Sequence, residues 1–201
     1  MMKKSIMLLF MLSLLVSCKD NPVSKKIKEA KQSVSNTNNA MEEIKDMQED
    51  IEALKKVTPL TNDELKAWLP DEINGMKRTK FTAGQASFMK IASIEATYES
   101  EDKSKKFKIQ VLDGAGEMGA AATAGVRMLL SQDFEEETES LVKKTAKRNG
   151  IKVIEEYNKN SNNSSVQFLQ DDRFFINANG THMDLEETWD AIEELKVENL
   201  E

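Results

Sequence analysis

The chain has 201 residues, of which 28 are Lys or Arg and 35 are Asp or Glu, so its formal net charge at pH 7 is −7. This acidic balance argues against a nucleic-acid partner, because phosphates are bound by basic surfaces. A single cysteine and a single histidine exclude most zinc sites and any Ser–His–Asp triad that is not built on that histidine.

The N-terminus has the organisation of a bacterial secretion signal. Two lysines form a short basic region, and an apolar run follows from residue 6 to residue 16. This run is shorter than the about 20 residues that a membrane-spanning helix needs, but it suits a signal peptide. It ends in the sequence LVSC, which resembles the lipobox of bacterial lipoproteins, whose cysteine is acylated and becomes the mature N-terminus. We therefore predict a lipoprotein signal peptide over residues 1–17 and lipid attachment at Cys18.

Cys18 has no second cysteine in the chain with which to form a disulfide. Two or three acyl chains would hold the protein on a bilayer without a transmembrane segment. In Gram-negative lipoproteins an aspartate after the cysteine often signals retention in the inner membrane, and the residue here is Lys19. The resemblance therefore implies the outer membrane, with its periplasmic and outer faces as alternatives. The alternatives to a lipoprotein are an ordinary signal peptide with an incidental cysteine and an uncleaved membrane anchor.

Residues 18–58 are predicted to be a tether between the lipid and a folded domain. The stretch 23–57 is rich in Lys, Glu, Asn and Gln, and Ile27, Val34 and Met41 recur every seven residues. This pattern predicts a long amphipathic helix. The simplest interpretation is a spacer that holds the domain off the membrane. Self-association, or docking of the 23–57 helix on an envelope protein partner, are the alternatives.

Residues 59–201 are predicted to form one α+β domain. Thr61 and Glu64 have the spacing of a capping box, which predicts a short helix that Pro70 ends. The dipeptide Asn149-Gly150 predicts a hairpin between two of the strands. Alternating apolar and polar residues predict strands that bury one face only, as in antiparallel sheets. The predicted strands are 87–98, 106–112, 141–148, 151–158, 166–170 and 173–178, and the predicted helices are 118–132 and 184–195.

The fold class that follows is α+β. We expect a mostly antiparallel sheet of about five to six strands with packed helices, preceded by a long N-terminal helical tether.

Gly114, Gly116 and Gly119 have the spacing G-x-G-x-x-G, which is also found in dinucleotide-binding loops. The strand before them alternates polar and apolar residues, whereas the strand before such a loop is buried on both faces. We therefore interpret the glycines as a joint between strand and helix, and predict no nucleotide or other cofactor. The helix is expected to approach the sheet through the face that carries Ala122 and Gly125.

The remaining polar residues give no pattern of a catalytic site or a metal site. His182 lies in a predicted turn and is interpreted as a loop residue. The carboxylate pairs Glu155-Glu156 and Glu186-Glu187 are adjacent in sequence, so their side chains are expected to diverge and to belong to a solvated face. The sequence therefore predicts no catalytic residue and no metal ligand, although the question of an enzyme stays open.

Four segments are similar to an uncharacterised group of bacterial secreted proteins and lipoproteins. They are DELKAWLPDEINGMKR, the Gly/Ala-rich helix, NGIKVIEEYN and DDRFFINANG. The resemblance implies the architecture of the domain and carries no activity. With the lipobox, it leads us to expect a lipid-anchored protein of the cell envelope with a non-enzymatic binding or scaffolding role. The alternatives are a lipid-anchored hydrolase or hydrolase accessory, and a small-molecule carrier.

Overall fold

The computed structural model describes residues 41–42, 44–84 and 91–200. The chain divides into two compact units, Met1–Asp46 and Met47–Glu201, and the fold given below is that of the second unit.

Several sequence predictions lie outside the described residues. They are the signal peptide, Cys18, the tether up to residue 40, and residues 87–90 of the predicted strand 87–98. Residues 44–54 are helical. None of the helices in the described part of the chain has the length and apolar character that crossing a bilayer requires.

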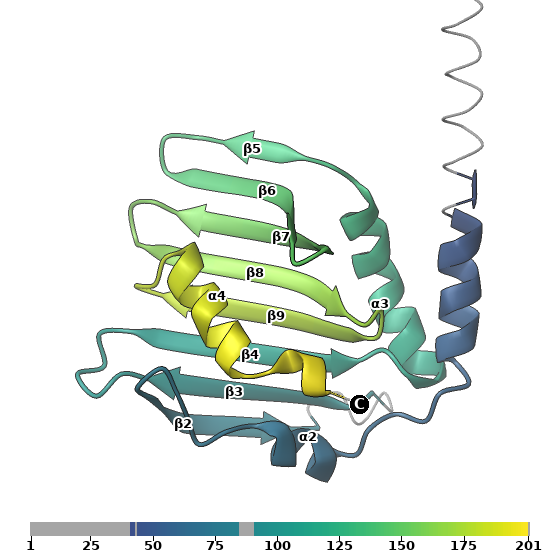
Figure 1. Ribbon diagram of the computed structural model, residues 1–201, viewed down its shortest axis with the longest axis horizontal. Coiled ribbons are helices and arrows are strands. Elements are labelled where there is room, and N and C mark those ends of the chain that lie inside the picture. Colours follow the sequence, from purple (N-terminus) through teal and green to yellow (C-terminus); the bar gives the residue numbers. More distant parts are fainter. Residues whose placement is uncertain (1–40, 43, 85–90, 201) are drawn as a thin grey trace, which may run out of the picture. The chain divides into compact units, whose positions relative to one another are not determined.

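Nine strands form one open antiparallel sheet (Figure 1). Their order is β1-β2-β3-β4-β9-β8-β7-β6-β5, so two meanders, β1–β4 and β5–β9, meet where β4 pairs with β9. The strands are β1 (Glu72–Ile73), β2 (Met76–Ala83), β3 (Ser93–Glu99), β4 (Lys106–Asp113), β5 (Glu135–Glu137), β6 (Leu141–Arg148), β7 (Ile151–Asn158), β8 (Asn163–Gln170) and β9 (Phe174–Thr181).

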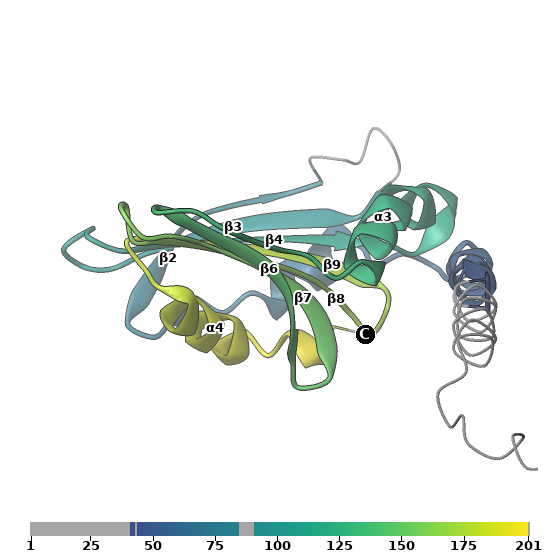
Figure 2. The same ribbon diagram turned by 90° about the horizontal axis from the view of Figure 1, so that it is seen from above.

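The helices lie on both faces of the sheet, as Figure 2 shows. Helix α3 (Gly116–Ser131) connects the two meanders and covers one face at β7 and β8. Helix α2 (Asn62–Trp68) and helix α4 (Leu185–Glu194) lie on the opposite face, where α4 packs on β7, β8 and β9. A short 3₁₀ helix, η2 (Val197–Asn199), follows α4.

The α+β class and the antiparallel pairing agree with the sequence prediction, but the number of strands does not. The sheet has nine strands instead of five or six, and the additional ones are β1, β2 and β5. β2 carries three basic residues and buries little of its surface, whereas β5 consists of three exposed glutamates. Neither strand has the alternation from which strands were predicted.

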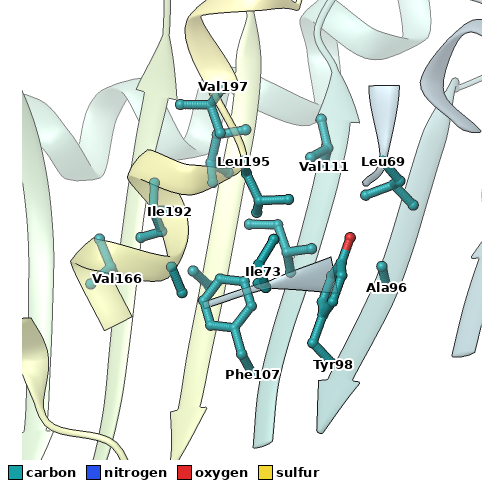
Figure 3. Packing of buried hydrophobic residues seen from close by; sticks show 14 of the residues in the cluster. Leu69, Ile73, Ala96, Tyr98, Phe107, Val111, Val166, Ile192, Leu195 and Val197 are labelled. Atoms are coloured by element: carbon teal, nitrogen blue, oxygen red, sulfur yellow. The ribbon is translucent and has the colours of Figure 1, made fainter. Parts of the chain in front are cut away.

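The main hydrophobic core lies between the sheet and the helices α2 and α4 (Figure 3). Tyr98 and Phe107 come from neighbouring strands, and Ile192 and Leu195 reach them from α4 and its C-terminal cap. A smaller cluster lies under α3, where Leu130 packs with Ile154 and Leu169. Most of the apolar burial that stabilises the domain is therefore on the α4 face.

The turn before α3 explains the three glycines of the G-x-G-x-x-G pattern. Gly116 has φ +76°, which an L-residue adopts only with strain. A Cβ at Gly114 would lie 2.5 Å from the carbonyl oxygen of Arg173, and one at Gly119 would lie 2.5 Å from that of Asp113. The close approach of backbones at this joint accounts for the glycines.

The prediction of which face of α3 approaches the sheet is wrong. The buried residues of the helix are Gly119, Ala120, Thr123, Arg127 and Leu130. The predicted face, which includes Ala122 and Gly125, is exposed. The error arises because the face of α3 that packs on the sheet contains a charged residue, Arg127. The most apolar face of this helix is therefore not the buried one.

Candidate functional site

A cleft of about 530 Å³ runs along one side of α4, and we call it the α4 cleft. Its floor is formed by apolar side chains of β7 and β8, and its second wall is the turn between β6 and β7. Figure 2 shows this hairpin bending toward the face that carries α4. The lining residues are Arg148, Asn149, Ile151, Val153, Phe168, Gln170, Trp189, Ile192, Glu193, Val197 and Glu198.

The local sequence explains how α4 and the hairpin are positioned. Asp184 caps α4 by accepting a hydrogen bond from the backbone N–H of Glu187, whose side chain bonds back to the N–H of Asp184. Asn149 and Gly150 have φ values of +50° and +85°, as a tight turn with two left-handed residues requires. The hairpin that was predicted from Asn149-Gly150 is therefore confirmed, with Arg148 paired to Ile151 across the turn.

Trp189 of α4 is held in place by contacts on several sides. Its ring centroid lies 5.7 Å from that of Phe168, with the two planes tilted by 31°. The guanidinium carbon of Arg148 lies 5.5 Å from the ring centroid, at a distance that allows a cation–π interaction. The indole Nε1 donates a hydrogen bond of 2.9 Å to Oε1 of Glu155. The aromatic wall of the α4 cleft is therefore fixed in orientation.

Arg148 joins two carboxylates from separate elements. Its Nε donates to Oε1 of Glu155 at 3.1 Å, and its Nη2 pairs with Oε1 of Glu186. Glu155 is only 4% exposed, so its charge is compensated inside the protein by Arg148 and by the indole N–H. The hydrogen bonds to Glu186 and then to Glu155 raise the pKa of Arg148 above its usual value. The guanidinium thus remains charged.

The chemistry of the α4 cleft favours a ligand with an apolar group and with no charge or a positive charge. Its lining residues carry one positive charge, on Arg148, and two negative charges, on Glu193 and Glu198. An anionic ligand would compete for Arg148 with Glu155 and Glu186. A basic group of a ligand would instead face Glu193 and Glu198 at the rim, and an apolar group of the same ligand would contact Trp189.

A second cleft of about 540 Å³ lies along the other side of α4. Acidic residues of α4 dominate it, and Glu187 is occupied by its capping bond and by an ion pair with Lys105. Among the described residues, no group of His, Cys, Asp or Glu is arranged to hold a metal ion. This cleft therefore offers no arrangement of ligands on which to build a site.

The structure separates the neighbouring carboxylates, as expected, but the predicted solvated face is wrong for Glu155, which is buried beside Arg148 and Trp189. Glu156 pairs with Lys143 on the opposite face of the sheet from Glu155, and Glu187 pairs with Lys105 rather than with Arg148. His182 lies in a turn, is exposed, and its Nδ1 lies 2.9 Å from the carbonyl oxygen of Ser104.

No pattern in the sequence brings Glu155, Glu186 and Arg148 together. A signal for Glu155 was present, because it shares the inward parity of Val153 on β7 and is therefore a charge on an apolar strand face. Its partners could not be identified without the register of β6 and the position of α4.

The chain was compared with protein-family models, with curated proteins and with solved structures, and none of them matches. Inference about its function therefore depends on the residues and their geometry.

Proposed function

We propose that this protein is a lipid-anchored component of the outer membrane, and that its α+β domain binds an envelope partner. The lipobox-like LVSC sequence and the apolar run before it support acylation at Cys18. The charged stretch that follows provides a tether of about 40 residues between the lipid and the domain. The membrane contact is made by the lipid, and binding is the task of the domain.

The observation that carries the binding role is the α4 cleft. It combines an apolar floor with an aromatic wall whose orientation is fixed by Arg148 and Glu155. Binding sites commonly have this character, with a mainly apolar lining and a few polar groups that set orientation. The occupant that fits is an apolar side chain next to a basic one on an envelope protein. The basic group would lie near Glu193 and Glu198.

A small-molecule carrier is the second candidate, and the size of the cleft favours it. Ligand pockets commonly enclose about 300–1,000 Å³, and this cleft of about 530 Å³ falls in that range. The hydrolase alternative would have to use Glu155 and Glu186, the two carboxylates that converge here. Because both are paired with the same guanidinium, the arrangement favours binding over acid–base chemistry.

Photocrosslinking in living cells tests the proposed binding site. A photoreactive amino acid is introduced in place of Ile151, which lines the cleft, and in a second strain in place of Lys77, an exposed residue of β2. We expect a discrete protein adduct from position 151 and none from position 77. Equal adducts from both positions, or none from position 151, would contradict the proposed site.

Charge reversal tests the proposed chemistry of the occupant. Glu198→Lys changes the exposed rim of the α4 cleft, and Glu117→Lys is a matched reversal at the exposed start of α3, on the other face of the sheet. With a basic partner, Glu198→Lys should reduce the adduct from position 151 several-fold while Glu117→Lys leaves it unchanged. An adduct from position 151 that has the mass of a small molecule would favour the carrier instead.

A further inference from the structure

Helix α3 presents an apolar face to its surroundings. Met118 is 44% exposed, Met128 is 62% exposed and Leu129 is 43% exposed. Ala122 and Gly125 lie between them on the same face and are also exposed. From Met118 to Leu129 the exposed positions of α3 carry no charge, although 31% of the residues of the chain are charged. An apolar helix face of this kind indicates a docking surface for another element.

The small residues in the middle of this face suit the approach of a second helix. A Cβ placed on Gly125 would meet no atom within 4 Å, so the space above it is open. The spacing from Met118 to Ala122, Gly125 and Leu129 is four, three and four residues, which is the spacing of a helix–helix seam.

The helical segment 44–54 carries the complementary stripe. Met47, Ile51 and Leu54 follow one another at intervals of four and three residues, and they are the half-buried positions between residues 44 and 57. Ile44 is 55% exposed, whereas Ile51 in the same helix is half-buried, so Ile51 is covered more than its position on a helix requires. The other described residues between 44 and 57 are exposed.

The path of the chain brings the end of this segment to the start of α3. The backbone N–H of Leu60 donates to Oδ2 of Asp113 at 2.8 Å, just before the turn into α3. The ring of Pro59 is in contact with Gly116, because a Cβ there would lie 3.0 Å from its Cγ. Only Lys55 to Thr58 therefore separate the helical segment from a point fixed at the N-terminus of α3.

We propose that residues 47–54 pack antiparallel on the exposed face of α3. In this arrangement Leu54 lies at Met118, Ile51 at Ala122 and Met47 at Gly125. Both helices rise by about 1.5 Å per residue, so the two stripes keep the same register over their length. Because the segment is joined to the domain by four residues, its effective concentration is high, and a modest apolar contact is sufficient.

This contact has a consequence for the tether. Helix α3 and helix α4 lie on opposite faces of the sheet. A segment packed on α3 would therefore leave the α4 cleft uncovered. The part of the helix next to the domain is occupied within the chain, and a protein partner of the tether would have to bind before residue 47. The inference does not depend on the proposed function.

Disulfide formation in the full-length chain tests the contact, because Cys18 is the only natural cysteine. The pair Ile51→Cys with Ala122→Cys is oxidised in whole-cell lysate, and Ala53→Cys with Ala122→Cys is the matched control from the exposed side of the same helix. Each single variant reports any contribution from Cys18. We expect the first pair to form an intramolecular disulfide about tenfold faster than the control.

Two results would overturn the proposal. Equal rates of disulfide formation for both pairs would mean that Met47, Ile51 and Leu54 do not face α3. Crosslinking only between two chains would identify a second copy as the occupant. Hydrogen exchange on the Ala122→Glu variant gives an independent measurement, since a charge on the face should speed exchange of residues 47–54 several-fold while the strands keep their protection. Unchanged exchange in residues 47–54 would also count against the contact.

Discussion

Two buried charges in this domain, Asp113 and Arg127, are in opposite situations. Asp113 is fully buried and accepts hydrogen bonds from Arg173 Nε and Nη2 and from the backbone N–H groups of Leu60 and Ala115. The first of these contacts also raises the pKa of Arg173. Arg127 is buried as well, but in the described part of the chain its Nε and Nη2 have no hydrogen-bond partner. One charge is compensated and the other is only weakly so.

Arg173→Ala should lower the free energy of unfolding by about 3–5 kcal/mol, because it leaves the buried carboxylate of Asp113 without its counter-charge. Lys152→Ala is the control, since its ion pair with the exposed Asp133 is screened by solvent and should contribute little to the free energy of unfolding. Urea unfolding of the two variants measures both values. A loss no larger for Arg173→Ala than for Lys152→Ala would show that the Asp113 pair does not hold the domain together.

Arg127→Met should have the opposite effect to Arg173→Ala and should not lower the free energy of unfolding. Each unpaired buried N–H group costs about 1–3 kcal/mol. Among the described residues, Arg127 forms one ion pair, at 3.6 Å with the exposed Asp172. Methionine keeps most of the volume, so we expect equal or higher stability, by about 1–2 kcal/mol. A loss of more than about 1 kcal/mol in urea unfolding would mean that the guanidinium is satisfied in solution.

Tyr98 should make the domain sensitive to alkaline pH. Its side chain is fully buried and its hydroxyl donates to the carbonyl oxygen of Pro70 at 3.0 Å. Burial raises the pKa of Tyr98 from 10.0 to about 12. Because the folded-state pKa is the higher one, this contribution is complete below pH 10 and is lost as the pH rises toward 12.

The lost contribution amounts to about 2–3 kcal/mol at most. It is measured as the difference in unfolding free energy between the natural chain and Tyr98→Phe at increasing pH. The advantage of the natural chain should shrink above pH 10, and a difference that stays constant up to pH 12 would be evidence against a buried, neutral Tyr98.

At the scale of elements, α3 provides the sharpest test of close packing. Gly119→Ala places a Cβ 2.5 Å from the carbonyl oxygen of Asp113, so the helix must shift, at a cost of about 1–3 kcal/mol. A Cβ at Gly125 meets no atom within 4 Å, and Met47, which we place beside this position, has a flexible side chain that can move aside. Gly125→Ala should therefore stabilise the helix by about 1 kcal/mol. Thermal unfolding compares the two. The same sign for both substitutions would be incompatible with the position of α3 on the sheet.

Local signals predicted the elements that depend on local interactions. The capping box at Thr61 and Glu64 is present at the start of α2, and Asn149-Gly150 joins β6 to β7. β2 and β5 were not predicted because they are polar strands toward the edges of the sheet. They are held by pairing with neighbouring strands and not by burial of apolar side chains, so they lack an apolar pattern. The face of α3 was assigned wrongly because the buried position Arg127 is charged.

At the scale of the whole molecule, the candidate site depends on contacts that no local pattern specifies. Arg148 ends β6, Glu155 lies in β7 and Glu186 lies in α4, 38 residues away from Arg148. Their meeting requires the register of the hairpin and the position of α4 across the sheet. The sequence could therefore predict an α+β domain and an unusual charge on β7, but it could not predict the α4 cleft.

The proposed role of the whole molecule requires, before anything else, that Cys18 carries a lipid. Metabolic labelling with a palmitate analogue, followed by membrane fractionation, compares the natural chain with Cys18→Ala. We expect label on the natural chain, recovered in the outer membrane, and none on Cys18→Ala. Absence of label on the natural chain, or equal label on both, would contradict a lipoprotein anchored through Cys18.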